Sequence, residues 1–224
     1  MVGVRALGIR GCGVSMPLKE AVIPHLDELD DTARTVGAVN TIVNDGGHLR
    51  GYNTDVLGAA RALEAASVTA EDRILLLGAG GMARAMLYAL QQRAIERIVV
   101  ANRTLERAHS IASNVVPWEG REDIDADVLI NTTPIGMRPH GNRLPVSVAA
   151  LTKYRAVIDA VTVLPLTRLV REAQERGVTA IAGWTLALHQ ALAQFELYTN
   201  LKAPEEPMRA ALLDFLGKGA TASQ

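Results

Sequence analysis

The stretch RILLLGAGGMA, residues 73–83, decides the fold. Its apolar first half predicts a buried strand, and its glycines lead into a helical pattern that we expect over residues 81–93. A strand, a glycine turn and a helix in this order form the context in which G-x-G-x-x-G/A binds the pyrophosphate of a dinucleotide. Gly78 permits the tight turn, Gly80 lets the backbone approach the phosphates, and Ala83 allows close packing of helix on strand. An ordinary glycine turn between a strand and a helix is the alternative interpretation.

The chain around this turn alternates short apolar runs with helical patterns. That rhythm predicts parallel strands joined by crossover helices. We therefore expect an α/β fold in which residues 56–183 form a Rossmann-type dinucleotide-binding domain. The further strands are expected at 97–101, 128–130, 156–158 and 178–181, and the further helices at 105–113 and 166–176.

The two ends of the chain have a different character. Residues 1–55 contain a strand-like segment at 11–15, a predicted helix after Pro17 and a turn-rich stretch at 43–52. Residues 184–224 predict two helices separated by Lys202-Ala203-Pro204. We expect both ends to pack together as a smaller α/β substrate domain, with hinges at the helix after Asp55 and near Gly183.

Composition excludes several classes of protein. The 23 basic and 24 acidic side chains give a net charge of −1, which argues against binding to nucleic acid or to a membrane surface. The single cysteine, Cys12, excludes an intramolecular disulfide and suits the cytoplasm. No signal-peptide pattern or membrane-length apolar run occurs, and the five histidines lack metal-binding spacing, so we expect no metal site.

The second predicted strand ends in Asn102-Arg103-Thr104, 24 positions after Gly78. An NAD site calls for a carboxylate about 20 residues on, to accept a hydrogen bond from the ribose 2′-hydroxyl, and none stands here. The Arg103 guanidinium instead suits a 2′-phosphate, so NADP is favoured over NAD. A surface arginine that begins a helix capped by Thr104 is the alternative. The loop 131–137 after the third strand could line the nicotinamide, or be an ordinary Pro/Gly turn.

Two polar residues are candidates for acid–base chemistry. Lys19 lies in the predicted first turn after Pro17, where the helix dipole opposes a cation and favours release of its proton. Asp55 follows Gly51-Tyr52-Asn53-Thr54 and precedes a predicted helix. From the residues alone, a carboxylate that caps this helix is the simpler interpretation of Asp55.

Seven segments in order give the chain its resemblance to a known family. They are GCGVSMPLKE (11–20), GAVNTI (37–42), GYNTD (51–55), GAGGMAR (78–84), NRT (102–104), NTTPIGM (131–137) and QALAQFELY (190–198). Each segment is weakly specific, but the ordered set resembles the shikimate dehydrogenase family, especially its shikimate 5-dehydrogenase-like branch. Such enzymes interconvert 3-dehydroshikimate and shikimate with NADP in aromatic amino-acid and chorismate biosynthesis.

The resemblance implies a role for each matching residue. Lys19 would be the catalytic lysine and Asp55 its partner, while Ser15, Asn40 and Gln190 would bind the substrate. The residues implied for NADP are Gly78, Gly80, Gly81, Met82, Ala83, Asn102, Arg103, Thr104, Thr132, Met137 and Gly183. The expected partner is a small shikimate-like molecule, and the expected assembly is a homodimer.

The chain also departs from the family pattern. Gly13 stands where Asn is frequent, Thr162 replaces a usual Tyr, and Leu186 replaces a usual Met. The family's Ser-x-Ser pair, which binds the substrate carboxylate, has no counterpart, so we expect a substrate domain incomplete at its N-terminus with an unpaired sheet edge. The alternative function is therefore a non-catalytic or weakly active NADP-binding relative.

Overall fold

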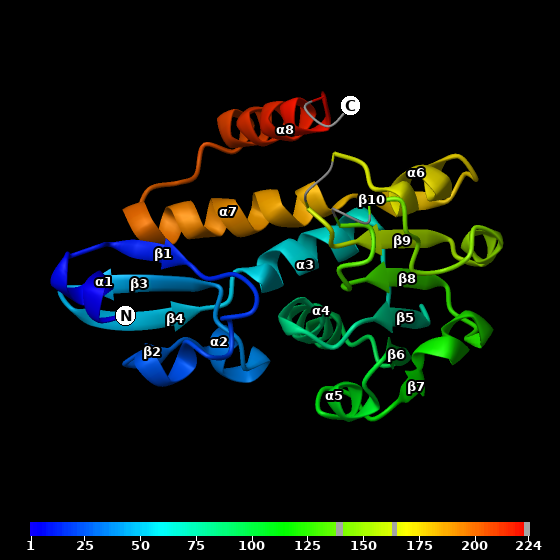
Figure 1. Cartoon of the computed structure of the whole chain (residues 1–224), viewed down its shortest axis with the longest axis horizontal. Coiled ribbons are helices and arrows are strands. Elements are labelled where there is room, and N and C mark those ends of the chain that lie inside the picture. Colours follow the sequence, from blue (N-terminus) through cyan, green and yellow to red (C-terminus); the bar gives the residue numbers. More distant parts are fainter. Residues whose placement is uncertain (138–140, 163–164, 222–224) are drawn as a thin grey trace.

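The computed structural model describes residues 1–137, 141–162 and 165–221. Its larger sheet has six strands, all parallel, in the order β10-β9-β8-β5-β6-β7 (Figure 1). A doubly wound order that starts from a central strand confirms the Rossmann-type α/β fold. The strands are β5 (Ile74–Leu77), β6 (Ile98–Asn102), β7 (Val115–Pro117), β8 (Val128–Asn131), β9 (Ala156–Asp159) and β10 (Thr179–Ile181).

The central strand β5 shows why these runs are apolar without alternation. Ile74 and Leu76 pack on one face of the sheet against α3 (Asp55–Ala65) and α4 (Gly81–Gln92). Leu75 and Leu77 pack on the other face, in a core shared with α6 (Arg168–Gln174) and a 3₁₀ turn at 149–153. A strand covered on both sides needs apolar residues at every position.

The smaller sheet lies within residues 11–52 and is mixed, in the order β1-β3-β4-β2. Its strands are β1 (Gly11–Gly13), β2 (Glu28–Leu29), β3 (Thr41–Asp45) and β4 (His48–Tyr52). β3 and β4 form an antiparallel hairpin closed by Gly46 and Gly47, both at positive φ. The prediction of a turn-rich stretch at 43–52 is therefore wrong, because only these two glycines turn and the flanking polar residues pair in register.

The predicted helix after Pro17 is also wrong. The segment makes turns and then a short 3₁₀ helix at Ile23–His25. The carbonyl of Lys19 accepts a hydrogen bond from the backbone N–H of Val39 at 2.8 Å, so it pairs with a distant segment. The helix-dipole argument for Lys19 consequently does not apply. Two helices that were not predicted, α1 (Val2–Ala6) and α2 (Asp31–Val36), complete this region, and α5 (Leu105–His109) ends four residues earlier than expected.

Two long helices connect the sheets. α3 and α7 (Gly183–Thr199) cross so closely that a Cβ on Gly58 would lie 2.5 Å from the carbonyl oxygen of Leu186 (Figure 1). α7 continues to the smaller sheet, where the Tyr198 ring fills the space that a side chain at Gly11 would need. The predicted second helix, α8 (Glu205–Thr221), follows Lys202-Ala203-Pro204. Among the described helices, none has the length and apolar character to cross a membrane.

Candidate active site

A cleft of about 370 Å³ lies between the two sheets. It gathers residues from both ends of the chain and from the dinucleotide-binding region, although they are far apart in sequence. Among its lining residues are the predicted Ser15, Lys19, Asn40, Asp55, Met82, Thr132, Met137 and Gln190, together with Gly13, Thr162 and Gln194.

Lys19 and Asp55 form an ion pair in this cleft. The Lys19 ammonium donates a hydrogen bond to Oδ2 of Asp55, from 36 positions away. The Lys19 side chain is 15% exposed and that of Asp55 is 0% exposed. A ligand in the cleft would therefore contact the lysine of this pair and not the buried carboxylate. Thr54 occupies the N-cap position of α3 and makes no side-chain cap, and the Asp55 carboxylate bonds to Lys19 and Asn40. The capping interpretation of Asp55 is thus wrong.

Asn40 holds the second oxygen of this carboxylate. Its Nδ2 donates to Oδ1 of Asp55 at 2.8 Å. Its own Oδ1 accepts from the backbone N–H of Thr54 at 2.7 Å and from the Thr41 hydroxyl at 2.8 Å. A backbone N–H can only donate, so this contact fixes the direction of the Asn40 amide. Both Lys19 and Asn40 therefore present a donor toward Asp55.

The glycine turn after β5 fits a dinucleotide. Gly78 has φ +108°, and a Cβ there would lie 2.6 Å from Oγ1 of Thr132, so only glycine is accommodated. A Cβ on Gly80 would meet no atom within 4 Å, so the space above the turn is open. α4 begins here with no side-chain cap, which leaves the amides of its first turn free to bind an anion.

This turn faces the ion pair. A Cβ on Gly81 would lie 3.4 Å from Cδ of Lys19, and Met82 lines the same cleft. Thr132 donates to the carbonyl oxygen of Leu77 at 2.6 Å and thereby holds the loop after β8 beside the turn. A cofactor on the turn and a substrate beside Lys19 would consequently meet within one cleft.

The end of β6 presents Arg103, the residue predicted to bind the 2′-phosphate of NADP. Arg103 is exposed and makes no hydrogen bond or ion pair with other described residues. Asn102 donates to the carbonyl oxygen of Thr104 at 2.8 Å, which turns the chain into α5. Thr104 stands at the N-cap position, but its side chain makes no capping bond, contrary to the alternative interpretation. The guanidinium is free for a ligand.

A buried pair of polar residues, which was not predicted, holds the loops that line the cleft on the side of the larger sheet. Asn131 and Asp159, both 0% exposed, end the neighbouring strands β8 and β9. Nδ2 of Asn131 donates to Asp159 at 2.9 Å, and its Oδ1 accepts from the Thr133 hydroxyl at 2.6 Å. Asp159 also accepts from the N–H of Val161 and from the Thr167 hydroxyl. The pair thus fixes both loops that line the cleft on the side of the larger sheet.

We expect Asp159 to make folding stability depend on pH. Burial raises the pKa of Asp159 to about 6 from 3.8, although three hydrogen bonds oppose the shift. A raised pKa in the folded state favours folding below about pH 4, and this advantage is lost as the pH rises through 6. The free energy of unfolding of Asp159→Asn, relative to that of the wild type, should therefore rise by about 2 kcal/mol between pH 4 and pH 7. Urea unfolding of both proteins across this range measures the difference, and parallel pH curves would contradict it.

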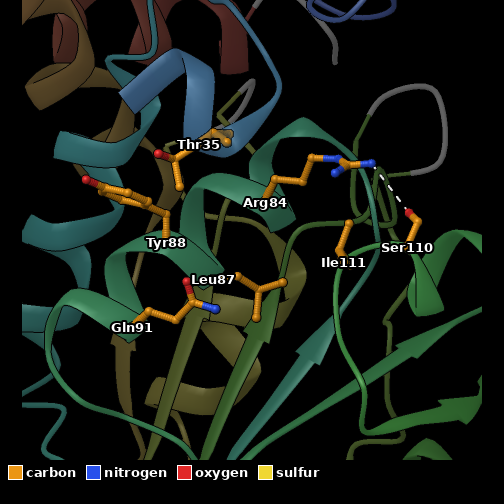
Figure 2. A pocket seen from close by; sticks show the side chains of 8 residues that line it. Thr35, Arg84, Leu87, Tyr88, Gln91, Ser110 and Ile111 are labelled. Atoms are coloured by element: carbon orange, nitrogen blue, oxygen red, sulfur yellow. Dashed lines mark hydrogen bonds between the residues drawn. The ribbon is translucent and has the colours of Figure 1, made fainter. Parts of the chain in front are cut away.

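A smaller pocket of about 170 Å³ lies between α2, α4 and the end of α5 (Figure 2). Arg84 of α4 reaches across it toward Ser110, with 3.4 Å between Nη2 and Oγ. Arg84 also lies 4.0 Å from the Glu20 carboxylate, next to Lys19 in the chain. This pocket shares no lining residue with the cleft, and it has one cation and no carboxylate. The Lys19–Asp55 pair belongs to the cleft and not to this pocket.

Comparison with known proteins gives a consistent result. Residues 1–42 match the shikimate dehydrogenase substrate binding domain, residues 60–128 match shikimate/quinate 5-dehydrogenase, and residues 183–213 match the shikimate 5′-dehydrogenase C-terminal domain. The NADP⁺ shikimate dehydrogenase of Pyrococcus abyssi is 40% identical over 97% of this chain and 83% of that protein.

Solved structures agree with the sequence matches. The quinate dehydrogenase of Corynebacterium glutamicum in complex with NAD has a TM-score of 0.87 and 33% identity, over 95% of this chain and 80% of that chain. The shikimate 5-dehydrogenase of Thermus thermophilus in complex with NADP(H) and shikimate has a TM-score of 0.82 and 34% identity, over 94% and 80%. With a parallel sheet that carries a glycine turn, and a Lys–Asp pair facing it, this chain belongs to the shikimate dehydrogenase family.

Proposed function

We propose that the protein is an NADP-dependent shikimate dehydrogenase that interconverts 3-dehydroshikimate and shikimate in aromatic amino-acid biosynthesis. The observation that carries this proposal is the Lys19–Asp55 ion pair in a cleft that also borders the glycine turn. Relatives named as NADP⁺ shikimate dehydrogenases support it. The alternative of a non-catalytic NADP-binding protein is not favoured, because the chain retains the ion pair, the cleft and the turn together.

The cofactor would be held by the turn and by Arg103. The pyrophosphate would bind the free amides at the start of α4, and the 2′-phosphate would bind the Arg103 guanidinium. Thr132 and Met137, which line the cleft, would border its nicotinamide half, whereas the predicted Gly183 is buried at the start of α7 and does not line the cleft. When bound, NADP supplies the ring that exchanges a hydride with the substrate carbon.

Residues of the cleft would carry out the proton transfer. In the direction of reduction, the Lys19 ammonium donates a proton to the substrate carbonyl oxygen as it becomes a hydroxyl, and in oxidation the amine takes that proton back. Asp55 would orient Lys19 through the buried ion pair, and Asn40 would hold the Asp55 carboxylate in place. Ser15 and Gln190, which line the cleft, would bind ring hydroxyls, so that the reacting carbon would lie beside both Lys19 and the glycine turn.

The direct test of this function is steady-state oxidation of shikimate with NADP⁺, in which the absorbance of NADPH measures the rate. We expect saturable turnover with shikimate. Binding of NADP⁺ in a calorimeter without turnover or binding of shikimate would instead support the non-catalytic alternative.

We expect Arg103→Ala to weaken NADP⁺ far more than NAD⁺. Loss of a charge-assisted hydrogen bond to phosphate removes about 1.5 to 3 kcal/mol, which is roughly a 10- to 150-fold rise in Kd for NADP⁺. NAD⁺ lacks the 2′-phosphate, so its Kd should stay within about twofold. Calorimetric titration of both nucleotides measures this, with Arg97→Ala, on a different exposed segment, as the matched control. Equal losses for both nucleotides would refute the role.

We also propose a division into two domains. Residues 56–183 would bind the nucleotide, and residues 1–55 with 184–224 would bind the substrate.

We propose that the protein is located in the cytoplasm, a reducing compartment that suits a chain with a single cysteine. For the assembly we propose a homodimer, with the Phe215 side chain of α8, which is 73% exposed, as a candidate contact. Light scattering of the wild type and of Phe215→Asp tests the homodimer, since a monomeric wild type would exclude it.

A further inference from the structure

A second cavity, of about 390 Å³, lies beside α3 and α7 and shares no lining residue with the cleft. Its volume is within the range of cavities that bind small molecules, about 300 to 1,000 Å³. The residues that line it come from the start of α2, the end of β4, α3 and α7. They are Asp30, Thr32, Tyr52, Asn53, Thr54, Val56, Leu57, Ala193, Glu196, Leu197 and Asn200.

Two carboxylates give this cavity a negative charge. Asp30 caps α2 by accepting a hydrogen bond from the backbone N–H of Ala33 at 2.8 Å. Glu196 is exposed and accepts from the backbone N–H of Ala203 at 3.1 Å. Neither carboxylate forms an ion pair with another described residue, and no Lys, Arg or His of the described chain lines the cavity. The cavity therefore attracts a cation and repels an anion.

Asn53, between β4 and α3, adds a buried acceptor to the lining. The residue is 3% exposed. Its Nδ2 donates to the carbonyl oxygen of Ala38 at 2.8 Å, and because a carbonyl can only accept, this bond fixes the direction of the amide. Oδ1 is buried and has no hydrogen-bond donor among the described residues. Buried acceptors in folded proteins rarely lack a donor, so this atom favours a ligand that carries N–H groups.

The two helices give the cavity an apolar wall, which consists of Val56, Leu57, Ala193 and Leu197. Leu57 is 51% exposed, so a ligand can cover it. Tyr52 adds an aromatic ring, and the Arg50 guanidinium lies 5.4 Å from the centroid of that ring. Arg50 does not line the cavity and lies 3.4 Å from the Glu28 carboxylate. Apolar surface beside unpaired carboxylates suits a ligand with an apolar body and a positive end.

We propose that this cavity binds a small organic cation, namely a primary amine with an apolar body. The Asp30 and Glu196 carboxylates attract its ammonium, which also supplies a donor for Asn53, and the body packs on the wall of α3 and α7. This site is independent of the proposed function. Asn53 and Thr54 directly precede Asp55, so an occupant of the cavity would touch the segment that carries the buried carboxylate of the cleft.

The test is calorimetric titration of the whole chain with 2-phenylethylamine, which is protonated at pH 7. We expect a Kd on the order of 1 to 10 mM, as is usual for a ligand with few atoms. The neutral 2-phenylethanol and the anionic 3-phenylpropionate have nearly the same shape. The alcohol should bind roughly tenfold more weakly than the amine, and the carboxylate should not bind measurably.

Variants of the lining place the amine in this cavity. The double variant Asp30→Asn, Glu196→Gln keeps the cap of α2 and the acceptor for Ala203 but removes both charges, so Kd for the amine should rise roughly tenfold. Leu57→Lys adds a cation at an exposed position of the wall and should weaken binding as much. Glu196→Gln alone repeats the test if the double variant does not fold.

The matched controls lie outside the cavity. Glu71→Gln removes an exposed carboxylate, and Leu213→Lys adds a cation to α8 at a leucine that is 39% exposed. Both should bind the amine as the wild type does. A wild type that does not bind the amine, equal binding of the amine and the alcohol, or unchanged binding in Leu57→Lys and Glu196→Gln would overturn the proposal. None of these measurements uses shikimate or a nucleotide, so their failure is distinct from a failure of the proposed function.

Discussion

Lys19→Ala is expected to lower kcat for shikimate oxidation by about 10²- to 10⁴-fold, the usual contribution of a positioned proton donor or acceptor. The ammonium is the cationic end of the ion pair and the part of it that opens to the cleft. Without it, the proton of the substrate hydroxyl has no base at the reacting oxygen. KM for NADP⁺ should change little, because the proposed nucleotide site consists of the glycine turn and Arg103 and does not include Lys19. Steady-state kinetics of the purified variant measures both constants.

Two further measurements separate proton transfer from charge and folding. Lys19→Arg keeps a cation beside Asp55 but cannot give up its proton at neutral pH, so it should be nearly as inactive as Lys19→Ala. Lys19→Ala leaves the Asp55 carboxylate buried without its partner, so its stability must be checked by urea unfolding. Wild-type turnover in Lys19→Arg would show that the charge alone suffices and would overturn the acid–base role.

Gly183→Ala should destabilise the protein strongly, because the methyl group that it adds has no room in the folded structure. A Cβ at 183 would lie closer than 3.0 Å to the backbone carbonyl of Val161 and to the carbonyl oxygen of Asp159. Backbone atoms cannot rotate away as a side chain can, so α7 and the loop after β9 must separate. We expect a loss of about 3 kcal/mol in the free energy of unfolding, which corresponds to roughly 10 °C in Tm for a chain of this size.

The matched control is Gly217→Ala in α8, where a Cβ would meet no atom within 4 Å. Alanine in an exposed helix should stabilise the protein slightly, by about 0.5 to 1 kcal/mol. Thermal and urea unfolding of both variants give the comparison. A Gly183→Ala protein as stable as the wild type would mean that α7 can shift away from the Val161 carbonyl at little energetic cost.

The elements that could be predicted best from the sequence are the strands that consist of a continuous run of apolar residues. β5, β6, β8 and β9 are apolar at nearly every position because helices cover both faces of their sheet. The short α2 and β2 and the polar β3–β4 hairpin carry no such pattern, and pairing with distant residues determines them. The segment after Pro17 shows the same limit, because the bond between Val39 and the Lys19 carbonyl cannot be read from local residues.

The residues of the site also fall into two groups, those that local sequence predicts and those that only long-range contacts bring together. The glycine turn could be identified from its residues, since its spacing and its strand–helix context are local. The Lys19–Asp55 pair joins positions 36 apart, so only the resemblance to a family pointed to it. Gln194 was missed as a site residue because its contact with Thr41 exists only once α7 crosses β3. The Asn131–Asp159 pair was missed because two polar residues at strand ends give no signal of their mutual contact.

The close crossing of α3 and α7 has a mechanical consequence. Backbone lies directly against backbone at Gly58 and Leu186, so a side chain at position 58 would push α3 and α7 apart. Because α3 begins at Asp55 and α7 carries Gln190, such a displacement would separate residues that line the same cleft. The hydrogen atom at position 58 thus helps to set the width of a site that it does not touch.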